Sequence, residues 1–114
     1  MNERLYSMPV AKVYDLYVKK VMRKERSVED MDQVMGWVTQ LSPEQLHDLI
    51  ATQVTFREFF DRVTVNPAAE RITGSICGVK IQEIEDPLMK KIRYLDKVVD
   101  EVANGKTVEK VCSR

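Results

Sequence analysis

Cys77 is the residue of this chain whose setting most invites a chemical role. It stands between Ile76 and Gly78, and Lys80 follows three positions later. A reactive thiolate needs a nearby cation, imidazole or helix N-terminus that lowers its pKa. Nothing in the sequence brings Lys80 or the single histidine, His47, to the thiol. Cys77 is therefore a candidate reactive thiol, with a buried structural cysteine as the favoured interpretation.

Basic side chains at the end of the first amphipathic segment could bind an anion. With two later cations, the candidate anion-binding residues are Lys19, Lys20, Arg23, Lys24, Arg26, Lys80 and Arg93. Cations in the last turn of a helix also stabilise it, because they face the negative end of its dipole. The cluster is either a solvated helix end or a site for a small anion or an acidic partner.

Metal and cofactor motifs are missing from the sequence. His47 has no second His or Cys at helical spacing, so we expect an exposed or half-exposed helix residue. The acidic positions Glu83, Glu85 and Asp86 lack the spacing of a calcium loop. The Gly74–Gly78 segment lacks the Lys-Ser/Thr pair of a nucleotide phosphate loop. We expect no metal and no cofactor.

Composition excludes several classes of protein. The chain has 114 residues, 44% of them hydrophobic, with 18 basic and 18 acidic side chains that cancel. That balance argues against binding nucleic acid or membranes by bulk charge, and no apolar run approaches the roughly 20 residues of a membrane span. The segment 43–53 could imitate a recognition helix, but it carries Glu44 and Asp48 and no Lys or Arg, so nucleic acid is an unlikely partner. We expect a single cytoplasmic domain, residues 1–114.

Apolar residues at helical spacing predict a series of amphipathic helices. The first begins near Pro9 and ends near Arg23 or Lys24. Capping signals start the later ones at Ser27, Ser42, Thr55, Asn66, Asp86 and Thr107. Gly36 within the second helix costs about 1 kcal/mol relative to Ala, so we expect another helix to approach closely there.

The stretch from Asp86 to Gly105 is the best-marked helix and the expected centre of the fold. Asp86-Pro87 is a strong start, and Asn104-Gly105 supplies the stop. Its apolar stripe consists of Leu88, Ile92, Leu95, Val99 and Val102. We expect the earlier helices to close their apolar sides onto this stripe.

The pattern changes between residues 72 and 84. Val79 and Ile81 alternate with polar residues, which favours an extended strand, and Cys77-Gly78 could form the turn of a tight hairpin. An isolated hairpin is marginally stable, so it should pack on the long helix or pair with another chain. The predicted fold is mainly α: a compact bundle of about five to six helices with one small β-hairpin or extended segment near residues 72–84.

Two long blocks of the sequence resemble a known family. The most specific pieces are Val13-Tyr14, Leu16-Tyr17-Val18, Arg23-Lys24 with Arg26, Trp37-Val38-Thr39, Ile72-Thr73-Gly74, Ile76-Cys77-Gly78, Asp86 to Met89 and Ile92 to Lys97. On these pieces the chain resembles the bacterial domain-of-unknown-function family 2200 over nearly its whole length. The resemblance implies a small bacterial protein of the cytoplasm without an assigned activity, and it supplies no catalytic residues.

Two hypotheses about function follow. The first is a non-enzymatic interaction protein that associates with itself as a homo-oligomer, because the hairpin is apolar and no catalytic set converges. The alternative is a protein, enzyme or not, that binds a small anion or nucleotide with the basic groups near Cys77. These basic groups should then meet in one cleft.

Overall fold

The computed structural model describes residues 2–76 and 78–114, which form a mainly helical protein as the sequence predicts. Seven α-helices, two 3-10 helices and two short strands lie within this described part. Their bounds are α1 (Glu3–Tyr6), α2 (Val10–Arg23), α3 (Val28–Thr39), α4 (Pro43–Ala51), α5 (Phe56–Arg62), η1 (Pro67–Arg71), β1 (Ser75–Ile76), β2 (Val79–Lys80), η2 (Ile81–Glu83), α6 (Pro87–Ala103) and α7 (Val108–Cys112). Helix α1 was not predicted, because four residues are too few to show a periodic apolar stripe.

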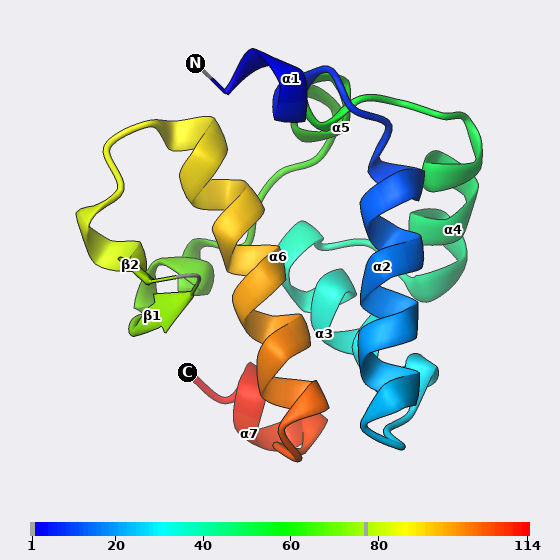
Figure 1. Ribbon diagram of the computed structural model, residues 1–114, viewed down its shortest axis with the longest axis vertical. Coiled ribbons are helices and arrows are strands. Elements are labelled where there is room, and N and C mark those ends of the chain that lie inside the picture. The colour runs from blue at the N-terminus through cyan, green and yellow to red at the C-terminus, as the bar shows by residue number, and fades with distance from the viewer. Residues whose placement is uncertain (1, 77) are drawn as a thin grey trace.

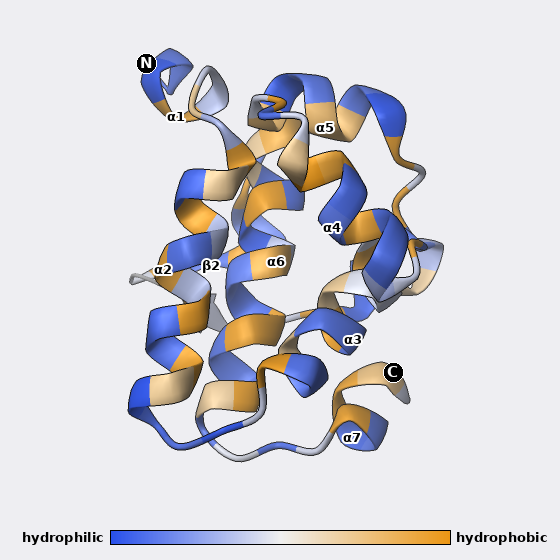
Figure 2. Cartoon of the chain, turned by 90° about the vertical axis from the view of Figure 1, so that its right-hand side faces the viewer, coloured by the Kyte–Doolittle hydropathy of each residue, from blue (hydrophilic) through white to orange (hydrophobic). Residues whose placement is uncertain are grey.

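Helix α6 runs through the middle of the molecule (Figure 1) and contacts α2, α3, α5, α7 and β1. Ile92, Leu95, Val99 and Val102 are at most 2% exposed, whereas Leu88 in the first turn is only partly buried. Figure 2 shows apolar and polar residues alternating along α2 and α6, the pattern of amphipathic helices. The expected central role of this helix is therefore confirmed.

Polar side chains begin the helices as their types predict. The hydroxyls of Ser27, Ser42, Thr55 and Thr107 each accept a hydrogen bond from a first-turn backbone N–H. Ser42 and Thr55 belong to complete capping boxes, in which a Gln or Glu side chain accepts from the backbone N–H of the cap residue. These local bonds fix where each helix starts, independently of the core.

The hairpin is shorter than the alternation of residues predicts. Strands β1 and β2 pair antiparallel, with Ser75 opposite Lys80 and Ile76 opposite Val79. The predicted turn includes Cys77, which lies outside the described residues. Ile81 does not extend β2 but starts η2, because its side chain is fully buried and its N–H donates to the Gly74 carbonyl at 2.9 Å. Burial of Ile81 in the core thus overrides the alternating pattern.

Gly36 is required by a close approach, but not by another helix as we expected. A Cβ at this position would lie 2.4 Å from the backbone oxygen of Leu41. Gln40 caps α3 in the left-handed conformation, with φ of 58°, and folds the chain back over the last turn. The backbone N–H of Leu41 then donates to the carbonyl of Gly36 at 3.2 Å. The neighbour that excludes a side chain is the chain's own turn.

Asp86 ties the start of α6 to α1 and gives the fold a pH dependence. Its Oδ1 accepts from the Leu88 N–H at 3.0 Å, and its Oδ2 accepts from the Tyr6 hydroxyl at 2.5 Å. The hydrogen bond from Tyr6 is the main cause that lowers the pKa of Asp86. A lowered pKa in the folded state means that this stabilisation is present above the unfolded pKa of about 3.9 and is lost as pH falls through the lower folded value.

We therefore expect Asp86→Asn to be less stable than the wild type at pH 6, and the gap to close below about pH 4. Urea unfolding midpoints of both proteins between pH 2 and pH 6 measure this difference in stability. A gap that stays constant over this range would contradict the role given to the carboxylate.

Candidate functional site

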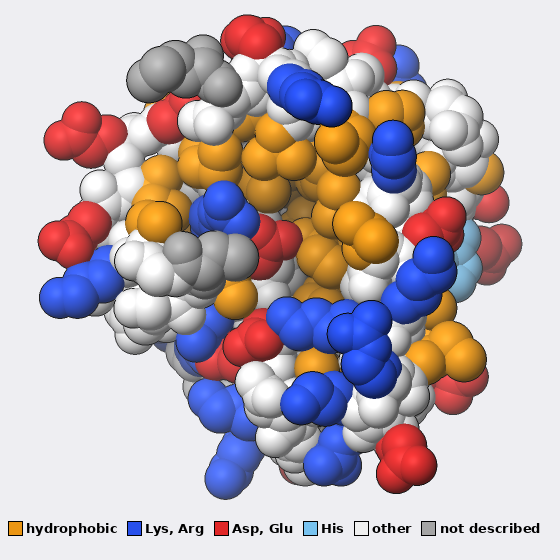
Figure 3. Space-filling model, in the orientation of Figure 1, with side chains coloured by type: hydrophobic (Ala, Val, Ile, Leu, Met, Phe, Trp, Pro, Cys, Tyr) orange, Lys and Arg blue, Asp and Glu red, His pale blue; other side chains and the backbone are white. Residues whose placement is uncertain are grey.

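A cavity of about 330 Å³, hereafter the α2–α6 cavity, opens between α2 and α6. Figure 3 shows it as an apolar hollow in one face of the molecule, with basic and acidic side chains along its border. Its apolar lining consists of Leu5, Val13, Leu16, Phe56, Ile76 and Ile92. Its polar lining consists of Tyr17, Lys20, Arg93 and Asp96. Each helix contributes apolar side chains to the wall, Val13 and Leu16 from α2 and Ile92 from α6, and Ile76 of β1 completes it.

The polar side chains of this cavity form one linked group of three and one separate ion pair. Arg93 Nη1 donates to Asp96 Oδ2 at 2.8 Å, and the Tyr17 hydroxyl donates to Asp96 Oδ1. Lys20 Nζ lies 2.8 Å from Asp100 Oδ1. The side chains of Arg93 and Asp96 are only 24% and 17% exposed, so these charges are partly shielded from water and their mutual attraction is stronger than on an open surface.

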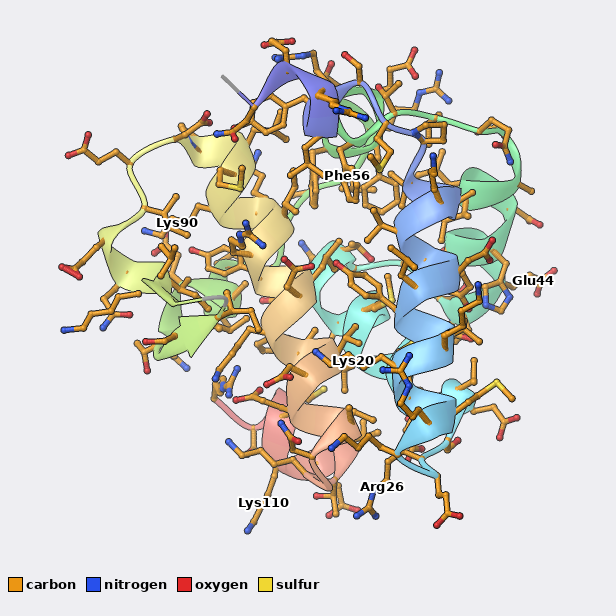
Figure 4. The ribbon with its side chains drawn as sticks, viewed as in Figure 1. Lys20, Arg26, Glu44, Phe56, Lys90 and Lys110 are labelled. Atoms are coloured by element: carbon orange, nitrogen blue, oxygen red, sulfur yellow. The ribbon has the colours of Figure 1, made fainter. Side chains whose placement is uncertain are left out.

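Phe56 and Lys20 lie toward different ends of the cavity. In Figure 4, Phe56 lies near the upper end of the gap between α2 and α6, and Lys20 lies lower, between the same two helices. The cavity therefore offers an apolar section and a charged section to one molecule.

Lys20 and Arg93 are the two predicted anion-binding residues that the structure brings to one cavity. Lys19, Arg23 and Lys24 are exposed at the end of α2, and Lys80 is exposed on β2. Arg26 lies against Gly105. A Cβ atom added to Gly105 would be 2.9 Å from Nη2 of Arg26. Cys77, the candidate thiol, lies outside the described residues.

A second polar cluster, Tyr14, Asp32 and His47, escaped the sequence analysis. Asp32 is 4% exposed, and its oxygens are 2.6 Å from the Tyr14 hydroxyl and 2.8 Å from His47 Nε2. Burial, followed by the hydrogen bond to Asp32, raises the pKa of Tyr14. His47 is half exposed, as the sequence indicates, with 50% of its side chain accessible. The three residues belong to α2, α3 and α4, so the cluster ties these helices together.

One signal could have revealed this cluster. Asp32 lies four residues after Val28 and three before Met35, which places a carboxylate on the side of α3 that faces the core.

Within the described part of the chain, no group of three or more His, Cys, Asp or Glu residues is arranged to hold a metal ion. None of the helices there has the length and apolar character that crossing a membrane requires.

Fold and cavity together define a small helical protein in which a ligand-sized cleft adjoins the central helix. The chain belongs to the family described as "Uncharacterized protein conserved in bacteria (DUF2200)", whose sequence model matches residues 4–113. The resemblance seen in the sequence is thereby confirmed, and the family description assigns no activity.

A solved structure agrees with this membership. It is the "Crystal structure of uncharacterized protein SP1917", which is 41% identical in sequence and superposes with a TM-score of 0.92. The match covers 99% of this chain and 93% of that one. A comparison with curated proteins finds no match.

Proposed function

We propose that this protein is a binding module whose α2–α6 cavity takes a small, mostly apolar molecule with one carboxylate group. The observation that carries the proposal is the lining, in which apolar side chains fill most of the wall and Tyr17, Lys20, Arg93 and Asp96 supply the polar part. Ligand sites are typically about 300–1,000 Å³, mainly apolar, with a few polar groups that orient the ligand. At about 330 Å³, the cavity suits a small ligand.

The two cations retain donors for such a carboxylate. A guanidinium has five N–H donors and an ammonium has three, and the hydrogen bond from Arg93 to Asp96 and the ion pair of Lys20 with Asp100 leave others for a ligand. Charge-assisted bonds from an arginine to a carboxylate are among the stronger ones in proteins.

Asp96 and Asp100 favour a ligand with one carboxylate group over a nucleotide. Asp96 and Asp100 offset the charges of Arg93 and Lys20, so the polar section has little net positive charge. A triphosphate would meet two carboxylates there and be repelled, whereas one carboxylate group can share the donors. This pairing supports a singly charged ligand over the nucleotide that the sequence leaves open.

Octanoate titrated into the protein by calorimetry tests the proposal. Leu16→Trp should weaken binding at least 10-fold, because Leu16 lies in the wall of the cavity, is 58% exposed and can accept an indole that fills the opening. Met22→Trp is the matched control, since Met22 is on the same helix, is 62% exposed and is outside the lining. Octanol, which lacks the carboxylate, should bind more weakly than octanoate.

Equal affinity of octanoate for both tryptophan variants would overturn this assignment. Failure of the wild type to bind any straight-chain carboxylate of four to ten carbons would do the same.

Self-association is a second candidate, favoured by three exposed apolar side chains. Leu16, Met22 and Val79 are 58%, 62% and 44% exposed, and Val79 lies on β2, which pairs with β1 alone among the described strands. Unpaired strand edges can join a second copy of a chain. Light scattering at micromolar concentration decides, because a strict monomer removes this candidate.

We also propose the cytoplasm as the location of the protein. Cys112 is a free thiol in the described part of the chain, which agrees with a reducing compartment.

A further inference from the structure

A second cavity, hereafter the α6–η1 cavity, lies across α6 from the first and measures about 230 Å³. Its wall includes Pro67 and Glu70 of η1 and Lys90, Lys91 and Tyr94 of α6. The first cavity uses Ile92, Arg93 and Asp96 of the same helix. At 3.6 residues per turn, these two sets of α6 residues point in opposite directions. Figure 4 shows Lys90 and Lys20 on opposite sides of α6.

The two lysines of this cavity are cations without a fixed counter-charge. Both are partly buried, yet neither forms an ion pair within residues 2–76 and 78–114. By contrast, Lys20 and Lys106 are each paired with a carboxylate. The ammonium groups of Lys90 and Lys91 therefore keep their N–H donors for an anion in this cavity.

Tyr94 adds a hydrogen-bond donor to the same wall. Its residue is 4% exposed, and its hydroxyl makes no hydrogen bond to any described residue. The hydroxyls of Tyr6, Tyr14 and Tyr17 each donate to an aspartate. The Tyr94 hydroxyl itself is not fully enclosed, so it can donate to a ligand in the cavity.

We propose that the α6–η1 cavity binds a small oxyanion of single charge, held by the ammonium groups of Lys90 and Lys91 and the hydroxyl of Tyr94. Carboxylates and phosphate groups in their monoanionic form share this chemistry. Glu70, whose side chain is exposed at the wall of the cavity, sets the charge limit, because a second negative charge on the ligand would be repelled. This site is separate from the α2–α6 cavity and does not depend on the ligand proposed there.

Acetate and inorganic phosphate, titrated at about pH 5.5 against chloride at equal ionic strength, are the probes, because at this pH both are mainly singly charged. NMR shifts of the backbone amides of α6 are the readout. The constant ionic strength removes general screening. Tyr94→Phe keeps the ring and loses only the hydroxyl, so it should fold and bind about 5-fold more weakly. The double variant with Lys90→Gln and Lys91→Gln should weaken binding about 10-fold. Lys110→Gln, which removes one positive charge at an exposed position of α7, should have no effect.

Glu70→Gln sharpens the test, because removing the repelling carboxylate should tighten binding severalfold. A larger response to acetate than to phosphate identifies a carboxylate ligand, and the reverse identifies a phosphate group; either supports the proposal. Acetate and phosphate shifts no larger than those of chloride would overturn it. Unchanged affinity in both Tyr94→Phe and the lysine pair would overturn it as well.

Discussion

Replacing Leu95 by alanine lowers the free energy of unfolding by about 2–5 kcal/mol. Leu95 is 0% exposed in the middle of α6, the helix that contacts α2, α3, α5 and α7. Truncation removes buried methyl groups and leaves a cavity that neighbours on several helices cannot all move to fill. Because small domains are stable by only about 5–15 kcal/mol, this single change removes a large share of the total.

Urea unfolding at 25 °C measures the effect, and Leu88→Ala is the matched control. Leu88 is on the same helix with the same chemistry but is only partly buried, so its truncation should cost clearly less. Equal, small losses at both positions, each below about 1 kcal/mol, would contradict the central place of α6 in the core.

The second large effect is expected at Asp32. Asp32→Ala should lower the free energy of unfolding by about 3 kcal/mol, because two hydrogen bonds to a charged group are lost together. The Tyr14 hydroxyl and His47 Nε2 would lose the carboxylate at 2.6 and 2.8 Å and keep only their mutual contact at 3.2 Å, and a gap would replace the side chain of a residue that is 4% exposed. The three helices α2, α3 and α4 would lose their common tie.

Asp48→Ala serves as the control, since Asp48 is an exposed carboxylate on α4 next to His47. Its loss should change stability by less than about 0.5 kcal/mol. A double-mutant cycle between Asp32→Ala and Tyr14→Phe should show coupling of about 1 kcal/mol or more. Strict additivity would mean that the hydroxyl and the carboxylate do not depend on one another.

Local chemistry explains why most of the fold could be predicted. Ser42 with Gln45 and Thr55 with Glu58 start their helices through bonds within one turn, so their effect is visible in a short window of sequence. The stripe of α6 repeats over several turns and predicts a buried face. Ile81 differs, because its burial depends on packing between distant segments, and the alternating pattern around it could not show that.

The candidate site was only partly predictable, because its residues meet through packing. Lys20 was recognised as a cation, but its pairing with Asp100 exists only once α2 lies beside α6. Arg93 instead pairs with Asp96 three residues along the same helix, a spacing that is visible in the sequence. Tyr14, Asp32 and His47 come from three helices, and none forms a motif with its sequence neighbours.

Mapping octanoate onto the protein by backbone amide shifts is the most direct test of the α2–α6 cavity as a binding site. The largest shifts should fall on Val13, Leu16, Ile92 and Arg93, which line the cavity from both helices. Largest shifts around Met22 and Val79, or a response spread evenly over the surface, would contradict it.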